Sequence, residues 1–242
     1  YDSIIKPQIP TNIIPPHQMN IAFMEIFAEA SAKANYNFDS LFVPFRCVAV
    51  NVHTNKQVIF REGELPSAIR SSMTVPFYFK PIEVDGELLF DGGILNNFPQ
   101  DVIEKDFNPD YIIGSKVSSN FDKPKEDDIV SQIENLITAK TDFEIPEDKG
   151  ILIEPVVDGT GLMDFQNAEE LIENGYYEAG CKISQIKNKI KREQDIIDLH
   201  KRRKQFKDSV PELKFGTVMI DGLNSRQKKY IYRSINKQKN KS

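Results

Sequence analysis

Two Asp-Gly pairs, Asp85-Gly86 and Asp91-Gly92, lie six residues apart and indicate different roles. The first pair stands between two short apolar runs, and it supplies the positive backbone φ that a type I′ hairpin turn requires. Asp91 directly follows the apolar run Leu88–Phe90, at the carboxyl end of the strand that this run predicts. In open α/β sheets, the residues that bind ligands lie at the carboxyl ends of the strands. Taken alone, however, Asp91 also fits an ordinary turn, so its surroundings have to decide.

A carboxylate in this position could serve as the general base for a serine nucleophile. A serine hydroxyl attacks an ester only when a nearby base takes its proton, and an acyl-enzyme then forms and is hydrolysed. A carboxylate with an ordinary pKa of about 3.9 is a weak base at neutral pH, and burial and fixed geometry make it more effective. Gly92 and Gly93 suit a position beside Asp91, because they allow the backbone to turn sharply without Cβ clashes.

The segments around these residues alternate between helix-like and strand-like patterns, which favours an α/β architecture. Apolar residues at helical spacing predict helices over 20–33, 65–73, 98–105, 129–139 and 167–191. Apolar and β-branched runs predict strands over 42–52, 57–60, 82–84, 88–90, 111–117 and 150–154. Residues 167–191 are expected to form one or two helices, whose apolar stripe comprises Leu171, Ile172, Tyr176, Ile183, Ile186 and Ile190.

Together these residues resemble the patatin-like phospholipase family. The similar stretches are Pro44–Ala49, Ala68–Met73, Val75-Pro76 and Val84–Pro99, with a looser similarity as far as Lys191. In that family a serine on a strand-to-helix elbow attacks a lipid ester, and the aspartate of an Asp-Gly-Gly motif is its partner. The resemblance therefore implies a three-layer α/β/α hydrolase fold and a phospholipase A or esterase activity in lipid degradation. It also implies a Ser–Asp dyad with Asp91 as the base and Gly92 and Gly93 as supporting residues.

The serine side of that dyad does not appear in this chain. No G-x-S-x-G elbow is present: Ser72 has Arg70 and Thr74 at the two glycine positions, and Ser115 has a glycine on one side only. A glycine-rich loop for the oxyanion is also missing. Both features lie amino-terminal to the matched region in the family. We therefore expect residues 1–192 to be the C-terminal part of a patatin-like domain truncated upstream, and the chain alone to be inactive.

The carboxyl-terminal part of the chain differs sharply in charge from the rest. The net charge of −5 combines −17 over residues 1–181 with +12 over residues 182–242. The basic part fits a solvated helix followed by a linker, or a surface for an anionic partner. Residues 193–212 are interpreted as a charged linker.

The last segment, 213–242, resembles the start of a POTRA module, which precedes outer-membrane β-barrels. This resemblance rests on a strand-like run over 215–220, then Asp221-Gly222 and a basic helix over 227–235. It implies a small α+β unit and a place in the bacterial cell envelope, either outer-membrane-associated or secreted. A strand and helix that complete the first domain are the alternative.

The resemblance implies no metal or organic cofactor, and a phospholipid or other lipid ester as the substrate. A membrane surface is a second expected partner, whereas nucleic acid is not expected, because 182–204 lacks aromatics interleaved with its basic residues. Cys47 and Cys181 match no metal or redox spacing, so each is interpreted as a buried thiol. A catalytically silent patatin-like scaffold and a membrane-surface binding module remain the alternative functions.

Overall fold

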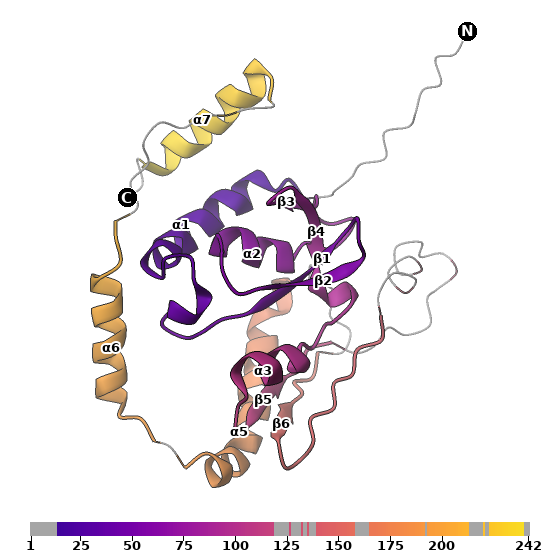
Figure 1. Cartoon of the computed structure of the whole chain (residues 1–242), viewed down its shortest axis with the longest axis vertical. Coiled ribbons are helices and arrows are strands. Elements are labelled where there is room, and N and C mark those ends of the chain that lie inside the picture. Colours follow the sequence, from indigo (N-terminus) through magenta and orange to yellow (C-terminus); the bar gives the residue numbers. More distant parts are fainter. Residues whose placement is uncertain are drawn as a thin grey trace.

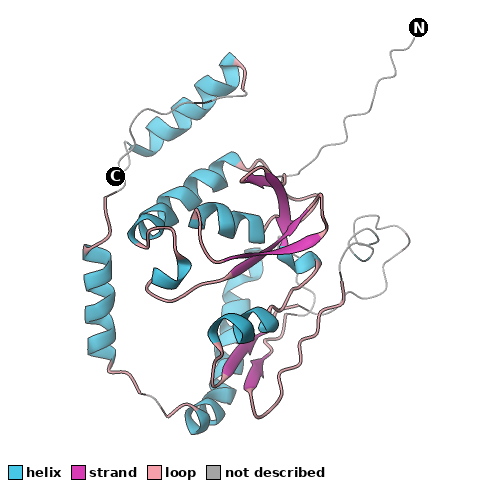
Figure 2. Ribbon diagram, in the orientation of Figure 1, coloured by secondary structure: helices cyan, strands magenta, loops and turns pink. Residues whose placement is uncertain are grey.

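The computed structural model describes residues 14–118, 126, 132, 135, 139–157, 165–191, 193–212, 220 and 223–239. They form a mixed α/β fold with one four-stranded and one two-stranded sheet (Figures 1 and 2). The strands are β1 (Cys47–Asn51), β2 (Lys56–Phe60), β3 (Ile82–Val84), β4 (Glu87–Asp91), β5 (Ile112–Ser115) and β6 (Gly150–Ile153). The helices are α1 (His17–Lys33), α2 (Leu65–Ser72), α3 (Gln100–Phe107), α5 (Ala168–Lys189), α6 (Ile196–Asp208) and α7 (Ser225–Lys239), with short 3-10 turns η1 (Phe38–Ser40), η2 (Gly92–Ile94) and η3 (Phe165–Asn167).

The larger sheet is antiparallel, with strand order β2-β1-β4-β3. Its central strand β1 is buried along its whole length. The predicted hairpin between β1 and β2 is confirmed, and the Asn51 side chain closes it by accepting hydrogen bonds of 2.9 Å from the backbone N–H groups of His53 and Thr54. The strand predicted from residue 42 begins only at Cys47, because Phe45 pairs instead with Phe38 of η1 through a backbone hydrogen bond.

The second predicted hairpin, between β3 and β4, is also confirmed. Asp85 and Gly86 have φ values of +51° and +81°, which are the positive values of a type I′ turn. This turn sets the register in which Val84 pairs with Glu87. Asp91, the last residue of β4, consequently lies opposite Ala49 of the buried central strand.

Helices α1 and α2 pack against each other, and α2 in turn packs on β1 and β4. Pro66 occupies the first turn of α2, where its missing N–H costs no hydrogen bond. The core between them consists of buried Phe38, Cys47, Leu65 and Ala68. Ser31 of α1 fixes the start of α2, since its hydroxyl accepts a hydrogen bond from the backbone N–H of Leu65 at 3.2 Å.

The smaller sheet pairs β5 and β6 in parallel, and α5 packs on β6. The contact is made near the amino end of α5, where the Asn174 amide donates to the carbonyl of Val156 at 3.1 Å. The single helix α5 confirms the helical prediction for 167–191. Its predicted apolar stripe, however, is only partly covered: Leu171 and Ile186 are half-buried, whereas Ile172 and Tyr176 are 70% and 84% exposed.

The predicted charged linker contains the helix α6, which Asp195 caps by accepting from the Ile197 N–H at 2.8 Å. The α6 side chain Phe206 lies against Phe42, with ring centroids 5.6 Å apart. None of the helices that the structure describes is both long and apolar enough to cross a membrane.

The predicted basic helix near the carboxyl end corresponds to α7. Asn224 and Gln227 cap its start reciprocally, each side chain accepting from the other's backbone N–H at 3.0 Å. Tyr230 of α7 meets the ring of His17 edge-on at 5.4 Å. Most of the predicted strand over 215–220, and most of the predicted helix over 129–139, lie outside the described residues. The boundaries at 192 and 212 therefore remain predictions.

The two cysteines differ in their exposure to solvent. Cys47 is buried in β1, and burial raises the pKa of its thiol to about 12. Cys181 of α5 is exposed, so the prediction of a buried thiol was wrong there. Helical spacing placed Cys181 correctly on α5, but Cys181 lies outside the half-buried side of this helix, which includes Asn174, Glu178 and Lys182.

Asp106, near the end of α3, attaches this helix to the larger sheet. Its carboxylate accepts hydrogen bonds from Arg46 Nε at 2.6 Å and from Arg61 at 2.7 and 2.9 Å. Arg46 also pairs with Asp39 at 2.7 Å, and its guanidinium lies over the Phe107 ring. Hydrogen bonds from Arg61 and Arg46 lower the pKa of Asp106 to about 2.

Replacing Asp106 with Asn should destabilise the protein, because it leaves the nearly buried Arg46 without one of its anionic partners. The folded-state pKa of Asp106 is depressed, so its contribution is present above the unfolded value of 3.8 and is lost as the pH falls through about 2. We expect Asp106→Asn to lower the melting temperature at pH 7 and to have progressively less effect toward pH 2. Asp110→Asn, at an exposed position, is the matched control.

Candidate active site

Both the backbone N–H and the side-chain carboxylate of Asp91 form hydrogen bonds with backbone groups. Its backbone N–H donates to the carbonyl of Thr74 at 3.0 Å, and its carboxylate accepts from the N–H of Gly93 at 2.7 Å. With φ −51° and ψ 133°, the residue caps η2, the 3-10 turn that follows β4. The carboxylate is therefore positioned by hydrogen bonds that do not depend on any flexible side chain.

Burial controls the acidity of this carboxylate. It raises the pKa of Asp91 to about 6, although the hydrogen bond from Gly93 N–H acts in the opposite direction by favouring the ionised form. At neutral pH the group is still mostly ionised and can accept a proton. A base with a pKa nearer the working pH is a more effective proton acceptor than an ordinary aspartate.

The two glycines after Asp91 are required by close packing rather than by backbone conformation. A Cβ at Gly92 would lie 2.5 Å from the carbonyl oxygen and Cγ2 of Val48 in β1. A Cβ at Gly93 would lie 2.8 Å from Asn97 Oδ1 and 3.2 Å from Asp91 Oδ1. Neither glycine has a positive φ, so the predicted sharp turn does not explain why these residues are glycines. The lack of space for a Cβ atom does. Gly92 brings β4 against β1, and Gly93 leaves room beside the carboxylate.

A buried arginine supports the segment that holds Asp91. Arg70 of α2 is only 2% exposed, and its guanidinium donates to Thr74 Oγ1 at 2.5 Å and to Asn20 Oδ1 at 3.2 Å. It also lies over the ring of Phe79, 5.0 Å from the centroid. Thr74 Oγ1 in turn donates to the carbonyl of Arg70 at 2.6 Å. This network fixes Thr74, whose own carbonyl receives the Asp91 N–H.

In the sequence, Arg70 lies within the family-like run Ala68–Met73, and Arg70 and Thr74 stand at the two glycine positions around Ser72, but no role is predicted for either side chain. The available signal was an arginine within the apolar run Ala68–Met73 of a short helix. Burial lowers the pKa of Arg70, and it forms no ion pair with a carboxylate in the part of the chain that the structure describes. Such a cation is costly to bury, which indicates a specific positional role.

No serine or histidine within the described residues bonds to the Asp91 carboxylate, which accepts only from Gly93 there. Ser71 is buried in α2 and donates to the carbonyl of Ser67 at 2.8 Å. His53 lies in the β1–β2 turn and His200 on the exposed side of α6. His17 lies at the start of α1 against Tyr230. Within the described residues, the Asp91 carboxylate is thus engaged by one backbone N–H group and by no side chain.

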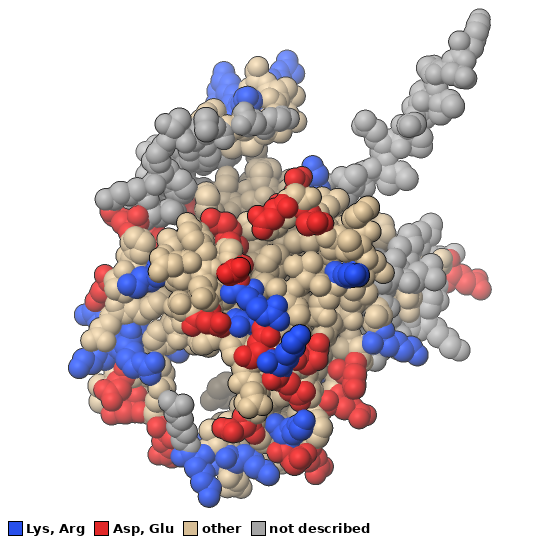
Figure 3. Space-filling model, viewed as in Figure 1, with Lys and Arg blue, Asp and Glu red and all other residues tan. Residues whose placement is uncertain are grey.

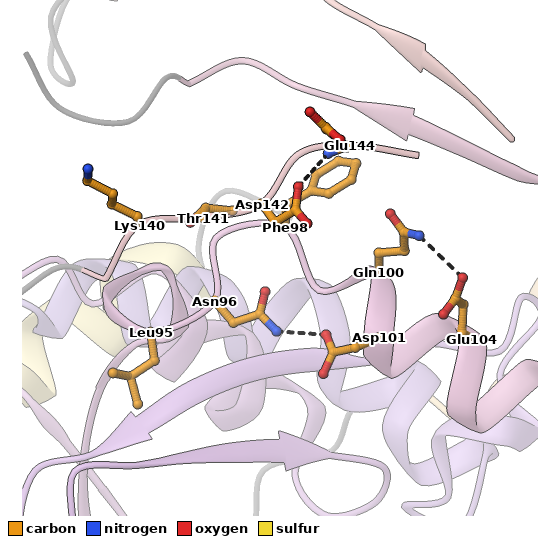
Figure 4. A pocket seen from close by; sticks show the side chains of 10 residues that line it. All are labelled: Leu95, Asn96, Phe98, Gln100, Asp101, Glu104, Lys140, Thr141, Asp142 and Glu144. Atoms are coloured by element: carbon orange, nitrogen blue, oxygen red, sulfur yellow. Dashed lines mark hydrogen bonds between the residues drawn. The ribbon is translucent and has the colours of Figure 1, made fainter. Parts of the chain in front are cut away.

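A pocket of about 310 Å³ opens beyond η2 (Figure 4). Four carboxylates, those of Asp101, Glu104, Asp142 and Glu144, line it together with Lys140. Two lining amides are engaged with these acids: Asn96 donates to Asp101 at 2.8 Å and Gln100 to Glu104 at 3.2 Å. Among the described residues, no group of three or more His, Cys, Asp or Glu is arranged to hold a metal ion. Eight of the ten residues that line the pocket are polar or charged, and the other two are Leu95 and Phe98.

The part of the chain that contains Asp91 is similar to a known protein family. Residues 22–103 match the family model described as patatin-like phospholipase, and they include Asp91, Gly92 and Gly93. An uncharacterized NTE family protein of Mycobacterium tuberculosis is 44% identical over 61 residues, or 25% of this chain and 17% of that protein. A patatin-like phospholipase domain-containing protein of Caenorhabditis elegans is 31% identical over 88 residues, or 36% of this chain and 6% of that protein.

The match therefore covers less than a fifth of either relative. The similarity to the patatin-like phospholipase family model is confined to residues 22–103. The matched residues end before β5, so neither the second sheet nor the basic tail is included.

Replacing Asp91 with Asn should stabilise the chain at alkaline pH. The folded-state pKa of about 6 is raised above the ordinary 3.8, so the associated stability is fully present below pH 3.8 and is lost as the pH rises through 6. Above that pH the wild type must bury a charge, whereas the amide of the variant stays neutral and can still accept from Gly93. We expect a gain of about 1–3 kcal/mol in unfolding free energy at pH 8, shrinking toward pH 5.

Urea unfolding across this pH range would measure the difference. Asp85→Asn is the matched control, since Asp85 is exposed in the hairpin turn and should show no such trend. If Asp91→Asn changed the unfolding free energy by the same amount at pH 5 and at pH 8, this result would argue against the raised pKa of Asp91.

The steric account of Gly92 gives a separate prediction. In Gly92→Ala the new methyl group meets the Val48 carbonyl at 2.5 Å, and backbone has to move. We expect a loss of about 2–3 kcal/mol in unfolding free energy, as for other overpacked sites. Gly180→Ala, in the middle of α5 with open space around it, should instead gain about 0.5–1 kcal/mol from helix propensity. Thermal melts of the two variants should move in opposite directions.

Proposed function

We propose that this chain supplies the general base, Asp91, to a lipid acyl hydrolase whose serine nucleophile and oxyanion loop lie outside these 242 residues. The observation that carries the proposal is the Asp91 carboxylate itself. It is half-buried, has a pKa raised to about 6, and is held by backbone groups within the segment that matches the patatin-like phospholipases. A carboxylate with only a turn-forming role would have no need of burial.

The chemistry follows from that carboxylate. Asp91 takes the proton of the serine hydroxyl as the serine oxygen attacks the ester carbonyl, and the tetrahedral intermediate forms. The protonated Asp91 then returns its proton to the alcohol oxygen as the C–O bond breaks, which leaves an acyl-serine. Water hydrolyses this ester in the same way, with Asp91 taking the proton of the attacking water. No histidine is needed at any step.

The substrate class and setting are part of the same proposal. The chain would act on phospholipids or related lipid esters as a carboxylic ester hydrolase, in the manner of a phospholipase A, and it would serve lipid degradation. The tail 213–242 would begin a POTRA-like module and place the enzyme in a bacterial cell envelope. The reciprocally capped, basic helix α7 supports a structured unit there, although the ring contact of Tyr230 with His17 equally suits a helix that belongs to the first domain.

The test uses a longer polypeptide that carries both this chain and the proposed serine nucleophile with its oxyanion loop. Asp91→Asn keeps the shape of the side chain but removes its ability to take a proton, so kcat on a short-chain nitrophenyl ester should fall by about 10²–10⁴. The wild-type kcat/KM should rise with pH through about 6, the pKa of Asp91. The variant should lose that rise while it remains folded.

Asp85→Asn is the internal control, because Asn tolerates the positive φ of the hairpin turn. It should retain wild-type activity. Activity that survives Asp91→Asn but not Asp85→Asn would show that the wrong Asp-Gly pair had been assigned to the site. A folded longer protein with no esterase activity in the wild type would favour the catalytically silent scaffold instead.

A further inference from the structure

Helix α6 presents a basic face to solvent. It carries five Lys or Arg residues and two Asp residues in thirteen positions. Phe206 and Arg202 turn toward the body of the protein, where both contact the ring of Phe42. The opposite side of the helix includes Ile197, Lys201, Lys204 and Lys207, together with His200 and Asp208, and all of them are exposed. We call the three lysines and Ile197 the outer face of α6.

Among the described residues, none forms a salt bridge with the lysines of this outer face, Lys201, Lys204 and Lys207. Lys and Arg side chains accordingly gather over α6 in the space-filling view, with acidic residues near the lower end of the helix (Figure 3). Asp195, which precedes the helix, caps it and so has its charge partly offset by the backbone N–H groups.

Two large aliphatic side chains stand at the beginning of the same helix. Ile196 and Ile197 are 68% and 74% exposed, although they are adjacent and strongly apolar. An exposed aliphatic pair beside a row of lysines combines the two attractions that hold peripheral helices at a bilayer: insertion of apolar groups and attraction to anionic headgroups.

The charge distribution of the whole chain would orient the protein as it approaches an anionic bilayer. Residues 1–181 carry a net charge of −17, and residues 182–242 carry +12. An anionic surface repels the first part and attracts the second, so the chain would approach with its basic end foremost. Nucleic acid offers the same negative charge but no apolar phase for Ile196 and Ile197.

We propose that the outer face of α6, with Ile196, is a docking surface for an anionic phospholipid bilayer. The lysines contact the headgroups, and the two isoleucines insert at the boundary of the acyl chains. This surface does not depend on Asp91 or on any ester cleavage. It would hold the chain at a lipid surface whether or not the attached domain is an active hydrolase.

Vesicle co-sedimentation of the full 242-residue chain tests the proposal. At about 0.1 M salt, where charges act over about 10 Å, the chain should bind phosphatidylcholine vesicles that contain one third phosphatidylglycerol and should not bind pure phosphatidylcholine. Raising the salt to about 1 M should release it. The variant K201E/K204E/K207E should bind roughly 100-fold more weakly, since each lysine at an anionic surface contributes about fivefold.

The matched control is K56E/K80E/K105E, which makes the same charge change at exposed lysines far from α6 in sequence. It should bind as the wild type does. The variant I196S/I197S should weaken vesicle binding by about tenfold or more while leaving the weak binding of duplex DNA unchanged. Equal losses in the two lysine variants would overturn the proposal. So would salt-resistant binding to both vesicle types, or tighter binding to DNA than to vesicles with no effect of the isoleucine changes.

Discussion

The hydrogen bond from the Asp91 N–H to the Thr74 carbonyl connects the larger sheet to the helix that packs on it. On one side of this bond stands β4, which Gly92 allows to approach β1 more closely than any residue with a Cβ could. On the other side stands the α2 segment, which Arg70 secures by bonding Thr74 and Asn20. The Asp91 carboxylate therefore projects from the point where a sheet and a helix are locked together, which is the kind of rigid support that a proton-transferring group requires.

Burial near this point has opposite effects on two charged groups. It raises the pKa of Asp91 and lowers that of Arg70, and in both cases the charged form loses the solvation that water would give. Natural proteins tolerate such costs where function demands a particular arrangement. Asp106 shows the contrasting case, because two arginines surround it and its charge is favoured. The protein thus contains one carboxylate with a pKa of about 6 and another that stays ionised down to about pH 2.

Local features of the fold could be predicted because their causes are local. Asp85-Gly86 determines its hairpin whatever surrounds it, and Pro66 marks the first turn of α2. The beginning of β1 could not be predicted, since the run before Cys47 is apolar enough for a strand but pairs with η1. Arg70 was missed for a similar reason: its partner Asn20 is fifty residues away. Helical spacing on α5 identified which residues share a face, but it carries no information about whether anything covers that face.

The contrast between the two cysteines has a chemical consequence. Thiolates, not thiols, react with alkylating reagents, and a buried thiol whose pKa is raised to about 12 is almost never a thiolate at neutral pH. Cys47 is therefore protected from alkylation both by its burial in the central strand and by the high pKa of its thiol. Cys181, by contrast, is exposed on α5. The chain consequently carries a single addressable thiol in its native state. A fluorophore or spin label attached there would report on the uncovered side of α5 without any engineered mutation.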